Sequence, residues 1–333
     1  MTDTSARTRG RRVLVTHDRL AENAIELLNA HDVDVFFSPA YAPSEQVAQR
    51  AAELQVDALI VRQGRVDEAI IAASPRLKVI AKHGVGVDNI DLQAAASRDI
   101  PVIRAMGSNS RAVAEHTIAL ALTLLKDIPR LDAAVKAGTW PKPSFIGRDI
   151  VGTVIGLVGF GSIGQHVARM AQGLGMTVLL HDPHARAAIA QFGADCERDL
   201  DSLIAEADIV SLHCPLTNTT RDLLDARRFG LMKPNSLVVN TARGALINEA
   251  ALAAALLEGR IAGAALDSFT VEPPAPDSPL WALPNLIATP HIAGVTAGSA
   301  KTMAEIAARH VIAVLDGEEP DAASLARLTE LAA

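Results

Sequence analysis

The stretch that decides the fold is Val151–Pro183, VGTVIGLVGFGSIGQHVARMAQGLGMTVLLHDP. Residues 153–158 form a short apolar run, which predicts a buried parallel strand. Three glycines follow in the spacing G-x-G-x-x-G, and apolar residues then recur at helical spacing until Gly175. A second apolar run, residues 177–180, predicts another strand and is followed by Asp182. The stretch therefore predicts a β-α-β unit.

The glycine spacing suits the pyrophosphate of a dinucleotide. Gly159 permits a tight turn, Gly161 lets the backbone approach the phosphates, and Gly164 lets the helix pack against the strand. The helix N-terminus then faces the anion. Glycines in this spacing also occur in loops without a ligand. Here the preceding strand, the following helix and Asp182, 18 residues after Gly164, all agree with a Rossmann domain.

Asp182 also predicts which dinucleotide binds. A carboxylate at the end of the second strand accepts hydrogen bonds from the adenosine ribose hydroxyls and repels a 2′-phosphate. The next residues, Pro183 and His184, offer no arginine to bind such a phosphate, and the nearest arginine is Arg186. We therefore predict NAD, not NADP, as the cofactor.

Composition bounds the remaining possibilities. The 333 residues suggest about two domains, and 49% of them are hydrophobic, which is enough for sizeable cores. The net charge of −7 argues against nonspecific nucleic-acid binding. Two cysteines, Cys196 and Cys214, do not make a disulfide scaffold, so we expect a reducing cytoplasm. Residues 1–12 are polar and basic and predict a flexible tail, not a signal peptide. No apolar run approaches the roughly 18 residues needed to span a membrane.

The chain before residue 105 alternates between strand and helix patterns, which predicts a small parallel sheet of its own. The expected strands are residues 12–16, 33–37, 58–61 and 77–80, and the expected helices are 21–29, 44–54 and 67–73. The segment 82–91, KHGVGVDNID, follows the last of these strands and places bare backbone N–H groups where open α/β sheets bind ligands. The alternative is an ordinary strand-to-helix turn.

Later segments repeat this arrangement. A long helix is expected at residues 110–131, with Ser110 as its N-cap, and residues 133–148 are expected to be a connection. Beyond the Rossmann stretch, strands are expected at 209–212, 237–240, 264–266 and 286–288, each running into a polar cluster. Because parallel strands end at one edge of a sheet, these clusters should gather beside the cofactor. A final helix is expected at 298–315.

Three residues of these clusters suit one reaction. Arg243 can grip a carboxylate with its planar guanidinium and polarise an adjacent carbonyl. His291 can exchange a proton near neutral pH, and a carboxylate such as Glu272 can orient the imidazole. Taken singly, each residue has an ordinary alternative as a surface charge, a loop carboxylate or a turn cap. With NAD nearby, together they predict reduction of 2-keto acids or oxidation of 2-hydroxy acids.

The polar clusters also carry a family resemblance. The chain resembles the D-isomer-specific 2-hydroxyacid dehydrogenases in the order and spacing of five segments. These are HGVGVDNID, GLVGFGSIGQHVA, ADIVSLHCPLTNTTRDLL, MKPNSLVVNTARGALINEAAL, and ALDSFTVEPP with NLIATPHIAG. One departure is the run 268–271, SFTV, where relatives usually have a valine and a further acid. The positions of Asp267 and Glu272 are kept, so the resemblance still implies activity.

The resemblance implies roles for individual residues. The catalytic arginine, glutamate and histidine of the family fall on Arg243, Glu272 and His291. Positions implied to bind substrate are Arg62, Val85, Gly86 and, in one of two alternatives, Trp140. No metal site is expected. Positions implied to contact NAD are Gly159, Gly161, Ser162, Ile163, Gly164, Asp182, His213, Cys214, Pro215, Thr220, Thr241, Ala242, Asp267 and Gly294.

The resemblance further implies an architecture of two Rossmann-like, doubly wound parallel-sheet domains with a cleft between them. A flavodoxin-like substrate domain of residues 1–105 and 299–333 would flank an NAD domain of residues 106–298. The 110–131 helix and its connection resemble a dimerisation arm, so a homodimer is expected. Trp140, in that connection, either packs against its own domain or reaches across the dimer to the partner's cleft.

The substrate stays open. Relatives acting on phosphoglycerate often have a serine and a threonine soon after the arginine matching Arg62, whereas this chain reads RQGR there. His83 also stands where many of them have a different residue. The candidates are therefore phosphoglycerate, hydroxypyruvate and glyoxylate. A second class of function is an NAD-sensing corepressor, which similar proteins of this fold perform. The acidic balance and the lack of a basic extension argue against it.

Overall fold

The structure is a computed structural model that describes residues 10–326. Most of the expected N-terminal tail (residues 1–9) and the last part of the expected first domain (residues 327–333) lie outside the described residues. The chain divides after Asn109 and after Val295 into two compact units. The first unit joins the segment before Ser110 to the segment from Thr296 onward, and the second unit is Ser110–Val295. The expected domain boundaries, after residues 105 and 298, fall a few residues from these divisions.

The first unit is built on a parallel sheet of five strands in the order β2-β1-β3-β4-β5. This is the 2-1-3-4-5 order of flavodoxin-like sheets. Four of the strands bury most of their residues, as parallel strands covered on both faces do, whereas the edge strand β2 buries only Val33. Their bounds are Arg11–Val15 (β1), Val33–Phe37 (β2), Ala58–Val61 (β3), Val79–Lys82 (β4) and Val102–Arg104 (β5).

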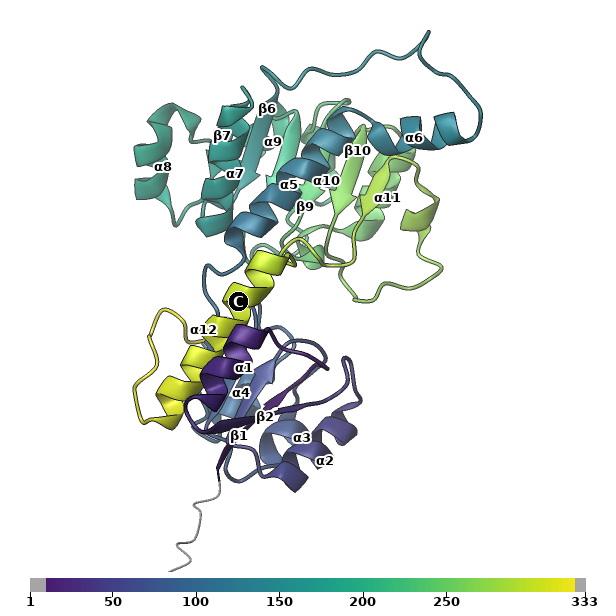
Figure 1. Ribbon diagram of the computed structural model, residues 1–333. Helices are drawn as coiled ribbons and strands as arrows, with labels where there is room; N and C mark the ends of the chain where they lie inside the picture. The colour runs from purple at the N-terminus through teal and green to yellow at the C-terminus, as the bar shows by residue number, and fades with distance from the viewer. Residues whose placement is uncertain (1–9, 327–333) are drawn as a thin grey trace, which may run out of the picture. The chain divides into compact units, whose positions relative to one another are not determined.

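Helices cover both faces of this sheet. Helix α12, at the end of the chain, packs beside α1 over one face, and both helices are visible side by side in Figure 1. Helices α2, α3 and α4 cover the other face. A capping box of Thr296 and Ser299 starts α12. The helices are Glu22–Asn29 (α1), Ser44–Leu54 (α2), Glu68–Ala72 (α3), Leu92–Ala96 (α4) and Ala297–Leu315 (α12).

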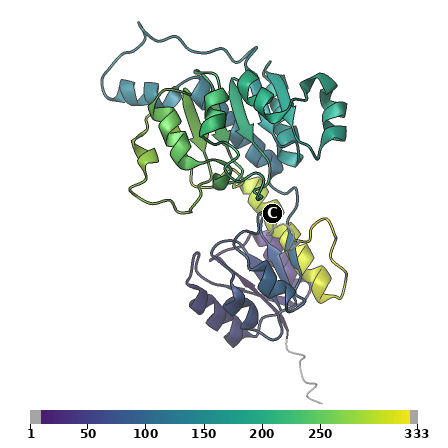
Figure 2. The ribbon, with the colours of Figure 1, turned by 180° about the vertical axis from the view of Figure 1, so that it is seen from behind.

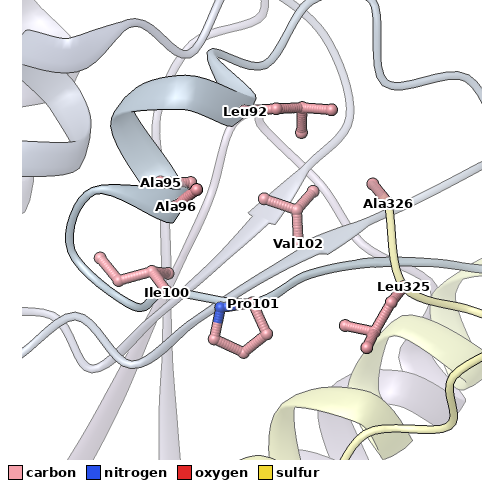
Figure 3. Close-up of a pocket in the computed structure, with 8 residues that line it drawn as sticks. All are labelled: Leu92, Ala95, Ala96, Ile100, Pro101, Val102, Leu325 and Ala326. Atoms are coloured by element: carbon pink, nitrogen blue, oxygen red, sulfur yellow. The ribbon is translucent and has the colours of Figure 1, made fainter. Parts of the chain in front are cut away.

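The chain segment after α12 returns to the edge of the first sheet. Leu325 bridges antiparallel to Ile103, the Arg104 amide donates to the Ser324 carbonyl, and the Ala326 amide donates to the Val102 carbonyl. This pairing covers the backbone of the edge strand β5. Between the segment and α4 lies a shallow apolar pocket, shown in Figure 3. Its lining residues are Leu92, Ala95, Ala96, Ile100, Pro101, Val102, Leu325 and Ala326.

The second unit is built on a parallel sheet of six strands in the order β11-β10-β9-β8-β6-β7. The direction of winding reverses between β6 and β8, which makes the carboxyl ends of these two strands a topological switch point. The strands are Val154–Val158 (β6), Thr177–His181 (β7), Ile209–Leu212 (β8), Leu237–Asn240 (β9), Gly263–Leu266 (β10) and Leu286–Ala288 (β11).

Two helical layers enclose the second sheet. Helices α5 and α7 pack together in one apolar core on one face, with α8 beside them. Helices α9, α10 and α11 form the other layer, which the view from behind in Figure 2 brings forward. The bounds are Ser110–Leu125 (α5), Ile128–Lys136 (α6), Ser162–Gly173 (α7), Arg186–Gly193 (α8), Leu200–Glu206 (α9), Ala226–Leu231 (α10) and Glu249–Leu257 (α11). Short 3₁₀ turns lie at Ala194–Cys196, Gly244–Leu246 and Pro279–Ala282. The expected fold class, α/β with two doubly wound parallel sheets, is confirmed.

The expected single helix at residues 110–131 is wrong in its extent. Helix α5 ends at Leu125, Asp127 adopts a left-handed backbone conformation with φ of 51°, and a separate helix α6 follows. Pro129 explains the break, because it has no N–H to donate to the Leu125 carbonyl and its ring would clash there. The expected connection is correspondingly shorter, since α6 continues to Lys136 and an open loop then returns to β6 (Figure 1).

Candidate active site

The glycine-rich turn after β6 lies at the switch point of the second sheet. Gly159 has φ of 102°, and a Cβ atom on it would lie 2.6 Å from the backbone nitrogen of Cys214. A side chain is therefore excluded by both strain and contact. The ends of β6 and β8 meet through this glycine. The turn matches the tight turn that the sequence predicted.

The other two glycines of the fingerprint shape the start of helix α7, which is where an anion would bind. Gly161 is the N-cap of α7 and has no side-chain cap, and a Cβ added to it would have open space around it. The first N–H groups of the helix are thus left for a ligand. A Cβ on Gly164 would lie 2.3 Å from the Gly159 carbonyl oxygen, so this glycine permits the close approach of helix and turn. Ser162 and Ile163 form the first turn of α7 beside them. This geometry fits a dinucleotide pyrophosphate.

Asp182 follows β7 directly and faces the same turn. Its Oδ2 accepts a hydrogen bond of 2.8 Å from the Phe160 amide, and its Oδ1 accepts one of 2.9 Å from the His184 amide. The side chain is only partly buried. Asp182 therefore holds the glycine-rich turn in place while keeping oxygen lone pairs for ribose hydroxyls.

The segment after β8 lies on the other side of the switch point, against the glycine-rich turn. His213 bonds to the Ser211 hydroxyl at 2.9 Å, and burial lowers the pKa of its imidazole to about 4, so it is neutral at pH 7. Burial, with Asp182 nearby, raises the pKa of the Cys214 thiol to about 11. Thr220 donates to the carbonyl of Pro215 at 2.7 Å and closes the turn between them. Residues 213–220 therefore carry no charge at neutral pH.

The loop after β9 carries Arg243, and the side chain of Asn240 forms hydrogen bonds to the backbone of this loop. The Asn240 side chain donates to the Arg243 carbonyl at 2.8 Å and accepts from the Ala242 amide at 3.0 Å. A Cβ on Gly244 would lie 1.9 Å from the backbone of Phe269, so only glycine permits this contact between the loops after β9 and β10. The contact brings Arg243 into the electrostatic range of Glu272.

Glu272 and His291 form a hydrogen-bonded pair. His291 Nδ1 lies 2.7 Å from Glu272 Oε2, and the Phe269 amide donates to Glu272 Oε1 at 2.9 Å. Burial pushes the pKa of Glu272 upward, but the hydrogen bonds from His291 and Phe269 and the nearby Arg243 outweigh it and lower the pKa overall. Glu272 is therefore a carboxylate at neutral pH. His291 has a half-exposed ring, so it can meet a ligand.

His291 adopts an uncommon backbone conformation, with φ of 55°. Left-handed backbone costs a residue with a Cβ about 1–3 kcal/mol and persists where the surroundings enforce it. Asp267 supplies that enforcement. Its Oδ1 accepts from the Thr289 hydroxyl (2.6 Å) and the Ile292 amide (2.9 Å), and its Oδ2 accepts from the Ala293 amide (2.8 Å). Gly294 follows directly. Asp267 is 1% exposed, and these bonds engage both of its oxygens.

The predicted substrate residues of the first unit gather at the carboxyl end of its sheet. Arg62 follows β3, and Val85 and Gly86 lie in the turn after β4. The His83 amide donates to the Val61 carbonyl at 3.0 Å, which joins that turn to the end of β3. Burial, with Arg62 next in effect, lowers the pKa of His83 to about 4. Arg62 and the turn that contains Val85 and Gly86 therefore lie at the same edge of this sheet.

Trp140 lies in the loop after α6 and is 69% exposed. It shares this exposure with other large apolar residues of the same segment, namely Ile128, Val135, Ile146 and Val151. None of the residues of α6 is buried. Within this chain, the indole is therefore not packed into the core of its own unit.

Sequence reasoning missed the residues that hold the loops of Arg243 and His291. Asn240 and Gly244 lie on either side of Arg243 in the chain. Thr289 lies two residues before His291, and His116 bonds to Thr289. Asn240 and Thr289 could have been found as polar residues at or just after the ends of buried strands. His116 lies on a helix distant in sequence, and its role depends on a contact with Thr289 that no local pattern indicates. Among residues 10–326, no group of three metal-ligating side chains is placed to hold a metal ion. No helix in that range has both the length and the apolar character needed to cross a membrane.

Comparison with known proteins decides the family. Residues 118–293 match the model of the D-isomer specific 2-hydroxyacid dehydrogenase, NAD binding domain. The chain belongs to the D-isomer specific 2-hydroxyacid dehydrogenase family. The resemblance inferred from the five sequence segments is confirmed, and so is NAD as the cofactor. The matched range contains Gly159, Asp182, Arg243, Glu272 and His291.

Individual relatives extend over nearly the whole chain. It is 41% identical over 311 residues to D-3-phosphoglycerate dehydrogenase 2, chloroplastic, of Arabidopsis thaliana, which covers 92% of this chain and 49% of that protein. The chain spans about half the length of this and other curated relatives it matches. The TT0316 protein of Thermus thermophilus is 36% identical, with a TM-score of 0.84, 95% of this chain covered and 100% of that one. A glyoxylate reductase from Paecilomyes thermophila is 28% identical, with a TM-score of 0.81 and coverage of 92% and 96%.

Proposed function

We propose that this protein is an NAD-dependent oxidoreductase that transfers a hydride between nicotinamide and C2 of a small 2-hydroxy or 2-keto acid. The observation that carries the proposal is the 2.7 Å pair of His291 and Glu272 beside Arg243, on the same unit as the dinucleotide fingerprint. Proton exchange, carboxylate binding and hydride transfer are the three parts that this reaction needs.

Arg243 is proposed to bind the substrate carboxylate and polarise its carbonyl. A guanidinium binds a carboxylate through two parallel hydrogen bonds and holds its charge at any physiological pH. The clamp by Asn240 and the contact at Gly244 restrict the backbone on both sides of Arg243. That restriction helps to orient the guanidinium before the substrate binds, so binding energy of the substrate is not needed to orient it.

His291 is proposed to protonate the carbonyl oxygen during reduction and to accept the hydroxyl proton during oxidation. Its Nδ1 faces Glu272, which leaves Nε2 for the substrate. The carboxylate favours the charged imidazolium and orients the ring. NADH, when bound, supplies the hydride that C2 receives. Hydride and proton together convert the keto group to a hydroxyl group.

The first unit is proposed to hold the rest of the substrate through Arg62, Val85 and Gly86. Backbone N–H groups of a glycine turn bind a carboxylate, and an arginine suits a further anionic or polar group. The candidate substrates are phosphoglycerate, hydroxypyruvate and glyoxylate. The names of the Arabidopsis relative and of the Paecilomyes neighbour support the first and the last of these.

A homodimer and a cytoplasmic location are also proposed. Exposed apolar side chains on α6 and its loop, Trp140 among them, favour burial against a second copy. Trp140 would then line the partner's substrate site. Cys196 and Cys214 are both free thiols, as expected in a reducing compartment. Sedimentation equilibrium should give twice the chain mass, and Trp140→Ala should shift it toward the monomer.

A substrate panel tests the activity. Purified protein is given NADH with glyoxylate, hydroxypyruvate and pyruvate, and NAD with 3-phosphoglycerate and D-2-hydroxy acids, each followed through the absorbance of NADH. We expect turnover with at least one of them and none with L-2-hydroxy acids. Tight NADH binding without turnover across the whole panel would instead support the corepressor alternative.

A further inference from the structure

Helix α5 carries two neighbouring polar side chains that contact two different strand-end loops. His116 reaches the loop after β11, which contains His291, and Thr117 reaches the loop after β9, which contains Arg243. The helix itself is anchored in the core of the second unit, against α7, β9 and β10. A rigid element therefore contacts both loops at adjacent residues.

The contact of His116 is the start of a directed chain of hydrogen bonds. Thr289 donates its hydroxyl hydrogen to Asp267 at 2.6 Å, so its oxygen can only accept from His116 Nε2, 3.2 Å away. His116 must then carry a hydrogen on Nε2. The same nitrogen lies 3.8 Å from Asp267 Oδ1. The hydrogen bonds therefore run in one direction. His116 on the helix donates to Thr289, and Thr289 donates to the Asp267 carboxylate, which is 1% exposed.

That carboxylate is what holds His291 in its left-handed conformation. Asp267 binds the amides of Ile292 and Ala293, the two residues after His291, and the hydroxyl of Thr289, two residues before it. Loss of one donor frees Thr289 to rotate and loosens one side of the loop. Because the φ of 55° is costly without such bonds, the loop should then relax away from the Glu272 pair.

The contact of Thr117 is buried completely. Its hydroxyl donates to the Val113 carbonyl at 2.8 Å, so the Thr241 hydroxyl, also 2.8 Å away, must donate to it. Thr117 is 0% exposed and Thr241 is 8% exposed. Thr241 is separated from Arg243 only by Ala242, whose amide binds Asn240. This contact fixes the upstream end of the Arg243 loop.

We propose that His116 and Thr117 are positioning residues, and that α5 sets the geometry of the two catalytic loops independently. His116 acts on His291 through Thr289 and Asp267, and Thr117 acts on Arg243 through Thr241. The catalytic part of this inference rests on the proposed function. The positioning part depends only on the contacts and is measured without substrate.

The first measurement is amide hydrogen exchange of the ligand-free protein. In His116→Ala we expect exchange at Ile292 and Ala293 to become about tenfold faster, while residues 241–243 keep their rates. In Thr117→Val, which preserves shape but removes the hydroxyl, we expect the reverse pattern. Each variant is therefore the control for the other. Equal acceleration of both loops in both variants, or of neither, overturns independent positioning whether or not the protein is an active dehydrogenase.

The second measurement is the kinetics of reduction. His116→Ala should lower kcat about tenfold and move the alkaline limb of its pH profile to lower pH, because His291 loses contact with Glu272. Thr117→Val should mainly raise the KM for the keto acid and leave that limb in place. Unchanged kcat and pH limb in His116→Ala, despite faster exchange at Ile292, would remove the catalytic role and keep the structural one.

Conservative variants separate positioning from general damage. His116→Gln keeps an N–H donor at nearly the same reach and should restore most of the lost kcat, and Thr117→Ser should restore the KM. Thr289→Val should reproduce the effects of His116→Ala, and the double variant should be no worse than either one. Glu115→Gln changes an exposed residue of the same helix that pairs with Arg111, and it should leave all of these values unchanged. Additive losses in the double variant would contradict a shared chain of hydrogen bonds.

Discussion

The two sheets each have a switch point, and the two switch points are built differently. In the second unit, the ends of β6 and β8 meet at Gly159, where the contact is between bare backbone atoms. In the first unit, the ends of β1 and β3 meet at Thr16. Its hydroxyl accepts from the Arg62 amide at 3.0 Å and donates to the Gln63 carbonyl at 2.9 Å. One switch point has bare backbone between its strand ends, and the other is bridged by a threonine side chain.

The difference teaches that topology only offers a place for a ligand. The switch point of the second unit has a helix N-terminus without a side-chain cap, and the Asp182 carboxylate binds the backbone of the turn before that helix. The switch point of the first unit has the Thr16 hydroxyl bonded across its strand ends, and Arg62 follows β3 directly. We therefore expect variants of the second unit to change chemistry and cofactor use, and variants of the first to change substrate affinity alone.

The largest effect is expected from His291→Ala. Removing the proposed proton carrier should lower kcat about 10²–10⁴-fold, the usual range for general acid–base catalysis, with little change in the KM for NADH. Steady-state reduction of the best keto acid measures it. His31→Ala, which removes an exposed histidine of the first unit, is the control. Near-normal kcat in His291→Ala would mean that another group carries the proton.

Arg243→Lys should cost about 10²-fold in kcat/KM although the charge is kept. An ammonium cannot form the two parallel hydrogen bonds of a guanidinium with a carboxylate. Arg260→Lys, at an exposed residue paired with Glu258, should be silent. A lysine variant at residue 243 with wild-type kcat/KM would contradict bidentate binding of the substrate.

Asp182→Ala should reduce the preference for NAD over NADP by about 10- to 100-fold. The variant loses the ribose contacts and also the repulsion of a 2′-phosphate. The ratio of kcat/KM for NADH and NADPH measures the change at fixed keto acid concentration. Equal use of the two cofactors by the wild-type protein would already refute the role given to Asp182.

Arg62→Ala tests the other half of the comparison. We expect the KM for the keto acid to rise about tenfold, since a charge-assisted hydrogen bond is lost, while kcat and the KM for NADH stay close to wild type. Arg65→Ala, at an exposed arginine of the same segment, is the matched control. A drop in kcat as large as that of Arg243→Lys would erase the distinction between the two units.

The smallest effect is expected from Glu272→Gln and appears in the pH profile. The pKa of Glu272 lies below its ordinary value, so the carboxylate is present at neutral pH and its stabilising effect is lost only as the pH falls through that lowered pKa. Replacing it with a neutral amide removes the charge that favours the His291 imidazolium. The alkaline limb of reduction should therefore move to lower pH. Glu258→Gln should leave the limb unchanged, and an unmoved limb in Glu272→Gln would show that the pair is only structural.

Most of the architecture could be predicted from the sequence alone, because strands, helices and turns each leave a local pattern of residues. Apolar runs of strand length, helical spacing and glycines at turns predicted four strands of the first sheet, but not β5, all six strands of the second, and the fingerprint around Gly159. The polar residue that follows each strand predicted that Asp182, Arg243, Asp267 and His291 would gather at one edge. The same patterns failed at Pro129, where one proline divides a periodic segment into α5 and α6. Periodicity alone does not detect a missing N–H donor.

Tertiary structure decided how the gathered residues are held, because hydrogen bonds and close contacts join segments far apart in the chain. The backbone of Phe269 lies too close to Gly244 for any side chain there. The Asp267 carboxylate accepts hydrogen bonds from the two amides after His291. His116 acquires its contact with Thr289 across 173 positions of sequence. No residue pattern near His116 encodes that contact. The fold of the chain creates it by placing the helix α5 and the strand end of β11 within reach of a single hydrogen bond.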